Sequence, residues 1–293
     1  MQRRILIQND AIKSGQDDVN SHIQMPKEVI KRFHNQYNLC CYYDVKGNFV
    51  GTKGTAESLN TAWGFFSART EHYLGEKIET PFGKVLAYID SLDFSQNSVS
   101  VNSDCEETIR DFMYSLITRD PVFMQEMGTE GNILSCLPEQ MQHDYVAING
   151  FSAIKRNGFL SDYLLTFQIN ETEIPFVLPI GGLYSYSYKG SIAINLPISK
   201  SIALCLIHKN LVDVMIKNGA VIMLSISDPD TMMDMNSWAF RMQKKRGWGY
   251  VVCPERHELD RLKSSLIRKN NLQFLKAMVQ SRYLEVRYGF CSR

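Results

Sequence analysis

The sequence predicts an α+β protein: a helical N-terminal half with a small β-hairpin, then a mainly antiparallel sheet crossed by at least one helix. Two observations predict it. Apolar residues recur at helical spacing in the first half, whereas from about residue 160 they form short runs separated by Gly, Pro, Asn and Ser. The first half shows no strand–helix–strand alternation, and no glycine-rich phosphate loop is evident.

The chain has 293 residues, of which 44% are hydrophobic and 22% charged. Such a composition supports a sizeable core. We expect a mainly helical region with a hairpin over residues 1–158 and a β-rich region with C-terminal helices over residues 159–293, together forming one compact globular unit.

The first predicted elements are a short helix and a hairpin. Pro26 suits the first turn of a helix, and Val29, Ile30 and Phe33 fall on one face of it. The following "NLCCYYDVKGNFVGT" predicts two strands with a turn at residues 46–47.

Three helical stretches follow. In the first, Pro81 is expected to kink the helix or to separate two helices. The second opens with Ser103 and Glu106, the spacing of a capping box, and Pro121 breaks or bends it. The third covers residues 132–156.

The second half is predicted to supply one sheet. Its strands are the runs "DYLLTFQI", "IPFVLPI", "GSIAINLPI", "SIALCLIH" and "AVIMLSI", and "GGLYSYSYKG" is expected to be a hairpin loop. Asp228 is a good N-cap for a helix that ends at Gly247, and "WGYVVC" predicts a strand after it. The last 35 residues indicate two more helices and a tail.

Charge and cysteine usage indicate which partners and which cellular compartment to expect. The net charge is +1, so bulk charge does not favour nucleic acid or membranes. The seven cysteines include no CxxC pair, which indicates reduced thiols and a cytoplasmic protein. The N-terminal apolar run, residues 5–7, is too short for a signal peptide, and no window approaches a membrane span.

A basic, aromatic stretch is the first candidate site. Arg241, Lys244, Lys245, Arg246 and Trp248 lie where a helix runs into a strand. Cations in a last helical turn complement the helix dipole, so the pattern is explained without a ligand. The alternative is a basic lip that contacts phosphates of a single-stranded nucleic acid.

Four further residues are candidates for catalysis. His22 is a general base or ligand, or else a structural histidine. Glu71 and Glu79 share a helix face and could bind a divalent metal or act as acid and base, or else form a solvated face. Arg119 is a ligand-binding arginine, or else an ion pair with Asp120 caps the helix break.

Familiar catalytic motifs are missing. "ERHEL" lacks the second histidine of a metalloprotease motif, because position 261 is Arg. No hydrolase triad is visible around "SYSYKG", and no E-x-K of metal-dependent nucleases follows the acids of "DYLLTFQINETEI".

The order of motifs resembles a bacterial domain-of-unknown-function family (DUF 4238 type) over residues 20–255. The resemblance is carried by "HIQMPKEVIKRF", "NLCCYYDVKGN", "GTAESLNTAWGFF", "TEHYLGEKIETPFGKVL", "LITRDP", "INLPISKSIALCLI" and "MNSWAFRMQKKRGWGYVV". The family's Ser-Asp-Asn-Pro strand end is replaced here by "IPFVLPIGG", which keeps Pro179 but has no acid. The resemblance implies an architecture and a bacterial setting, with phage defence as a context, rather than an activity.

Two functions follow as expectations. The first is a cytoplasmic protein that recognises a small ligand or a protein partner, as a phage-defence or stress effector. The alternative is a metal-dependent nuclease or hydrolase built on His22 and the Glu71/Glu79 helix. Convergence of His22, Glu79 and Arg119 in one pocket would favour the enzyme.

Overall fold

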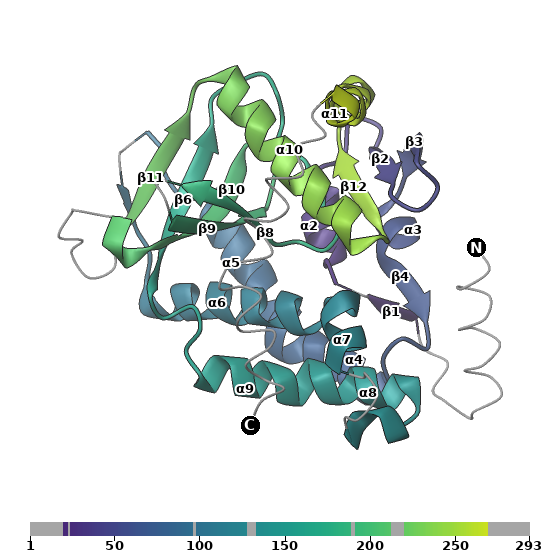
Figure 1. Ribbon diagram of the computed structural model, residues 1–293. Helices are drawn as coiled ribbons and strands as arrows, with labels where there is room; N and C mark the ends of the chain where they lie inside the picture. The colour runs from purple at the N-terminus through teal and green to yellow at the C-terminus, as the bar shows by residue number, and fades with distance from the viewer. Residues whose placement is uncertain are drawn as a thin grey trace.

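The computed structural model describes residues 20–22, 24–95, 98–127, 133–188, 191–211 and 220–268. These residues form helices together with largely antiparallel sheets, so the predicted α+β class is confirmed (Figure 1). Within them, the strands are β1 (Asn20–His22), β2 (Cys40–Asp44), β3 (Phe49–Gly54), β4 (Thr61–Trp63), β5 (Ser98–Ser100), β6 (Tyr163–Asn170), β7 (Leu178–Pro179), β8 (Tyr184–Tyr188), β9 (Ser191–Pro197), β10 (Ile202–His208), β11 (Ala220–Ile226) and β12 (Tyr250–Cys253).

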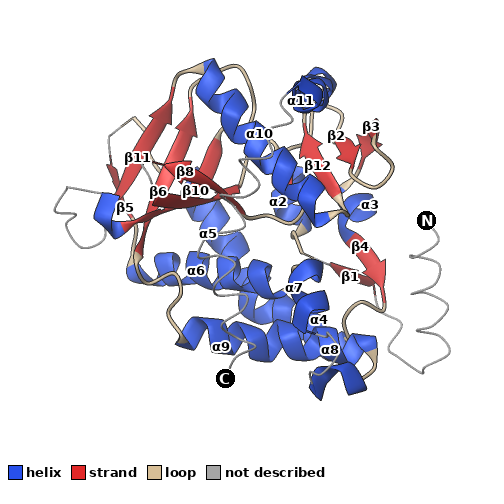
Figure 2. Cartoon of the chain, in the orientation of Figure 1, coloured by secondary structure: helices blue, strands red, loops and turns tan. Residues whose placement is uncertain are grey.

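Most helices of the described residues lie on one side of the larger sheet, whereas the helix at residues 256–268 packs against the smaller sheet (Figure 2). The described helices are α2 (Lys27–Lys31), α3 (Ala56–Asn60), α4 (Ala68–Leu74), the π-helix η1 (Gly75–Glu79), α5 (Thr80–Asp90), α6 (Ser103–Thr118), α7 (Pro121–Met127), the 3-10 helix η2 (Ile133–Cys136), α8 (Glu139–Tyr145), the π-helix η3 (Val146–Gly150), α9 (Phe151–Arg156), the 3-10 helix η4 (Lys209–Leu211), α10 (Pro229–Arg246) and α11 (Arg256–Arg268).

The larger sheet of the described residues has six strands in the order β5-β11-β6-β10-β9-β8. Its neighbours are antiparallel except β11 and β6, which run parallel. Side chains such as Phe167 and Leu204 point into the main core, where they join Phe82 and Phe112 of the helices beneath. Central strand β10 is buried on both faces, which explains its continuous apolar run.

A smaller sheet joins the two halves of the chain. Its order is β3-β2-β12-β7, so the early hairpin pairs with a strand near residue 250. Helix α10 contacts β8 of the larger sheet as well as β7 and β12 of this one. The position 158 proposed as a boundary therefore does not separate the sheets.

Two expected elements differ from the structure. The run "IPFVLPI" supplies only β7, which pairs with β12 in the smaller sheet instead of joining the larger one. The stretch expected to be a hairpin loop contains β8, whose tyrosines pair with β9. Alternating Tyr and Ser suits a strand with one buried face, and that periodicity was the missed signal.

Local signals placed both ends of α10. Asp228 caps α10 by accepting from the backbone N–H groups of Asp230 and Thr231, and Gly247 ends the helix at φ 73°. Helix α6, however, is capped by Asn102, which accepts from the N–H of Cys105 at 2.7 Å, and not by Ser103. Of the two helices expected in the C-terminal residues, α11 is the first, and the second lies outside the described residues.

Pro81 does not separate two helices. Helix α4 continues through η1 into α5, and Pro81 lies in the first turn of α5, directly after the π-turn. A π-turn widens the helix by one residue, and proline cannot donate a backbone hydrogen bond. The wider turn thus accommodates the proline while keeping Glu79 on the helix.

The segment that precedes α4 is fastened to α8 by polar side chains. His143 Nδ1 donates to the carbonyl of Phe65 at 3.0 Å, and its ring stacks on Phe65 with centroids 4.2 Å apart. Gln140 Nε2 donates to the carbonyls of Gly64 and Phe66. Burial is the main cause that lowers the pKa of His143 from its ordinary value, so the ring is neutral in the folded protein.

A pH dependence of stability follows from His143. Its folded pKa lies below the unfolded value of about 6.5, so the unfolded state binds more protons in that range. Stability is therefore present above that value and is lost as the pH falls through it. Urea unfolding between about pH 7.5 and 5.5 should show this decline, and His143→Gln should show a shallower one. An identical slope in the variant would contradict the assignment.

Candidate functional site

Arg119 lies at the C-terminal end of α6 and is fully buried. Its guanidinium donates to the Glu79 carboxylate at 2.6 Å, and Glu79 is 17% exposed at the end of η1. A second guanidinium N–H donates to the backbone carbonyl of Gln24. Arg119 thus joins α6 to the π-helix and to the segment that follows β1.

Asp120 makes the second buried ion pair, and its partner comes from a distant helix. One carboxylate oxygen accepts from Arg246 Nε at 2.8 Å, with both side chains about 7% exposed or less. The other accepts from the N–H of Val122 at 2.9 Å. Arg246 also donates to the carbonyl of Leu183, which ties the end of α10 to the approach to β8.

The two consecutive residues of "TRDP" therefore hold the fold together. The sequence left open whether Arg119 binds a ligand or whether an ion pair caps the helix break; the structure shows buried ion pairs, each with a partner far along the chain. Removing one partner of either pair would leave the other charge buried and uncompensated, which is strongly destabilising.

The catalytic candidates converge only in part. Glu79 and Arg119 form an ion pair, and Arg119 also donates to the carbonyl of Gln24, which lies two residues after His22. The backbone of His22 in β1 pairs with that of Thr61 in β4, but the His22 side chain lies outside the described part of the structure. Glu71 is half-buried on α4, two turns before Glu79, whereas Glu76 between them is exposed beside His72.

The basic stretch does not present its side chains as one surface. Arg246 is committed to the buried pair with Asp120, and Trp248 packs against the main core. Lys244 and Lys245 are exposed, and Arg241 is half-buried. The cations at the helix end thus divide between an interior role and a solvated turn.

A polar cleft of about 600 Å³ lies where the ends of the two sheets meet. Four segments line it: residues 34–37 before β2, residues 170–175 after β6, residues 200–201 between β9 and β10, and residues 254–255 after β12. The volume is in the range of small-molecule sites. Glu173 and Glu255 were set aside in the sequence because no catalytic motif surrounds them. The other lining residues were not candidates, because they come from four loops whose proximity no local pattern reveals.

The backbone around the cleft is fixed by side-chain hydrogen bonds. Asn170 Nδ2 donates to the carbonyls of Ile174 and Lys200, and its Oδ1 accepts from both the N–H and the hydroxyl of Thr172. On another segment, Asn35 Oδ1 accepts from the N–H of Tyr37 at 2.9 Å. A cleft that is ordered before binding loses less entropy when a ligand enters.

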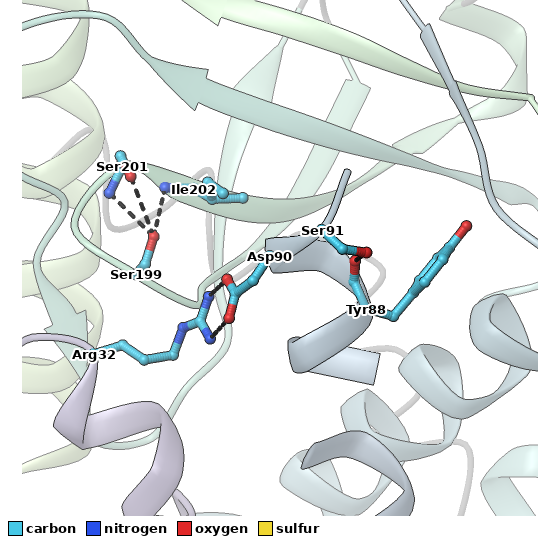
Figure 3. Close-up of polar contacts among 7 residues, drawn as sticks. All are labelled: Arg32, Tyr88, Asp90, Ser91, Ser199, Ser201 and Ile202. Atoms are coloured by element: carbon cyan, nitrogen blue, oxygen red, sulfur yellow. Dashed lines mark hydrogen bonds and ion pairs between the residues drawn. The ribbon is translucent and has the colours of Figure 1, made fainter. Parts of the chain in front are cut away.

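Neighbouring contacts hold two of the lining segments in place (Figure 3). Arg32, at the end of α2, donates both ends of its guanidinium to Asp90 at the end of α5. Ser199 Oγ accepts from the N–H groups of Ser201 and Ile202 at 3.2 and 3.0 Å, which closes the β9–β10 turn. Arg32 lies two residues before His34, so its ion pair with Asp90 anchors the first lining segment.

Several lining side chains are available to a ligand. The charged groups Glu173, Lys200 and Glu255 are exposed and form no ion pair with other described residues. Tyr37 is 72% exposed. His34 is half-buried; its Nε2 lacks a hydrogen-bond partner, and burial is the main cause that lowers its pKa.

The cysteines of the described residues are free thiols, as the sequence indicated. Burial raises the pKa of Cys40 and of Cys205 to about 12. Because the thiolate is the nucleophile, these two thiols are inert at neutral pH.

The described residues contain no group of three or more His, Cys, Asp or Glu side chains placed to hold a metal ion. The helices described here also include none with the length and apolar character needed to cross a membrane. A scan against protein-family models finds no match for the chain, and searches of curated proteins and of solved structures likewise find none.

Proposed function

We propose that this protein recognises a small polar ligand in the cleft between residues 34–37, 170–175, 200–201 and 254–255. The observation that carries the proposal is the combination of a fixed backbone with unpaired charged side chains around one cavity. Charges that serve the fold are paired, as Arg119 and Asp120 are. Those around the cleft are not, which suits a partner from outside the chain.

The alternative, a metal-dependent nuclease or hydrolase, has less support from the described residues. Its carboxylate Glu79 is engaged by Arg119 at 2.6 Å in the interior, whereas the cleft residues face solvent. The prediction is still testable: cleavage of labelled DNA or RNA with added divalent metal, lost in both His22→Ala and Glu79→Ala, would support it.

A blocked cleft tests the binding function. Ser201 is exposed on the cleft wall, so Ser201→Trp should fill the cavity. The β9–β10 turn should remain, because Ser201 donates its backbone N–H to Ser199 Oγ at 3.2 Å, whereas its hydroxyl makes only a long contact of 3.5 Å with the same oxygen. Compounds found by ligand-observed NMR in a panel of polar small molecules should bind the variant at least about tenfold more weakly, because the buried contact area is lost.

The control is Gln125→Trp, which introduces the same side chain at an exposed position of α7 that does not line the cleft. It should bind every compound as the wild type does. If Ser201→Trp binds all of them with unchanged affinity, the cleft is not the recognition site.

A further inference from the structure

The charged side chains of the cleft have an excess of negative charge. Glu173 and Glu255 come from different loops, and Lys200 is the cation among the lining residues. The cleft therefore carries a net −1 with His34 neutral, while the chain as a whole carries +1. Two carboxylates against one ammonium at the cleft favour a cation over an anion as its ligand.

We propose that the ligand carries an ammonium or guanidinium group, held by Glu173 and Glu255. This inference rests on the proposed function and adds the chemical class of the ligand. Carboxylates from two separate loops can accept several N–H donors of one cation. Their exposure keeps the cleft accessible, and the absence of ion pairs with other described residues leaves both acceptors free.

Tyr37 supports the same class of ligand. Its ring is 72% exposed at the cleft, on a segment fixed by Asn35. An exposed aromatic face attracts cations through its quadrupole, and Arg-like planar groups stack on it. A buried tyrosine would be explained by packing; one exposed to this extent is not.

Lys200 offers a further test because its positive charge would repel the proposed cationic ligand. Its backbone carbonyl accepts from Asn170 and from the N–H of Phe176, so the backbone of the turn does not depend on the side chain. Lys200→Gln should therefore bind a cation more tightly than the wild type. A merely structural role for the cleft would not give a gain of affinity.

The experiment compares two probes of nearly equal shape, Nα-acetyl-L-arginine amide and Nα-acetyl-L-citrulline amide, by calorimetry at low ionic strength. Because the α-amino group is acetylated in both, they differ only in the guanidinium charge. The arginine probe should bind at least about fivefold more tightly, the effect of one contact between opposite charges in water. Glu173→Gln and Glu255→Gln should each remove about that factor. Glu107→Gln, at an acid paired with Lys155 on another surface, should change nothing.

The outcomes separate this inference from the proposed function. Equal affinity for the two amides, no measurable binding of the arginine probe, or tighter binding of inorganic phosphate that Lys200→Gln removes would each overturn the cationic class. In those cases, if the compounds found by NMR, or phosphate, bind Ser201→Trp more weakly than the wild type, the cleft still recognises ligands although their class is not cationic. Unchanged binding in Ser201→Trp would instead overturn the proposed function itself.

Discussion

Arg119→Met is expected to lower the free energy of unfolding by about 3–5 kcal/mol, because it removes one partner of a buried ion pair. The Glu79 carboxylate would lose its 2.6 Å contact while only 17% exposed, and the Gln24 carbonyl would lose its donor. Urea unfolding followed by tryptophan fluorescence measures the loss directly.

Two comparisons make this result specific. Glu79→Met combined with Arg119→Met removes both charges and should recover much of the stability, because apolar replacement of a buried pair is often neutral. Lys155→Met breaks half-exposed ion pairs with Glu107 and Asp111 and should cost no more than about 1 kcal/mol. If Arg119→Met cost as little as Lys155→Met, the pair would not be a determinant of the fold.

The second large effect is expected at Arg246. Arg246→Met should destabilise the protein by about 3–5 kcal/mol, since Asp120 would remain buried without its cation. Lys244→Met, two residues earlier on the same helix end, should stay within about 0.5 kcal/mol because its side chain is exposed. Both variants are measured by the same urea titration.

Variants at Arg246 and Lys244 also test the role of the basic stretch. Were the stretch a nucleic-acid lip, removing Lys244 or Arg241 would weaken binding of labelled single-stranded RNA and flatten its salt dependence. Arg246 is expected to act through folding instead. An Arg246→Met protein that kept full stability but lost RNA binding would show that the guanidinium is offered to a ligand and not to Asp120.

The sequence anticipated features that depend on neighbours within a few positions. The α+β class, the hairpin β2–β3 and both ends of α10 were predicted correctly. Each follows from residues close along the chain: alternation in a strand, Asp228 at a cap, Gly247 at a left-handed end. The nearby error at α6 is of the same kind, because Asn102 and Ser103 are both good caps and only backbone geometry chooses.

Candidate sites were harder, because a residue's type does not reveal its partner. Arg119 was singled out as either a ligand contact or part of an ion pair that caps the helix break; the structure shows an ion pair, but nothing local indicated its partner Glu79, 40 positions away. For Arg246, the dipole of its own helix gave a sufficient explanation, while its partner Asp120 lies 126 positions away. The cleft was missed entirely because its lining comes from four loops.

The sequence by itself determined the class of fold, where most helices and strands lie, and which residues bear charge. Tertiary structure alone decided that β7 pairs with β12, that "TRDP" holds distant helices together, and that Glu173, Lys200 and Glu255 share one cleft. The physical reason is how far along the chain each interaction reaches. Capping and periodicity act within one or two turns, whereas burial of a charge or the meeting of loops depends on the packing of the whole core.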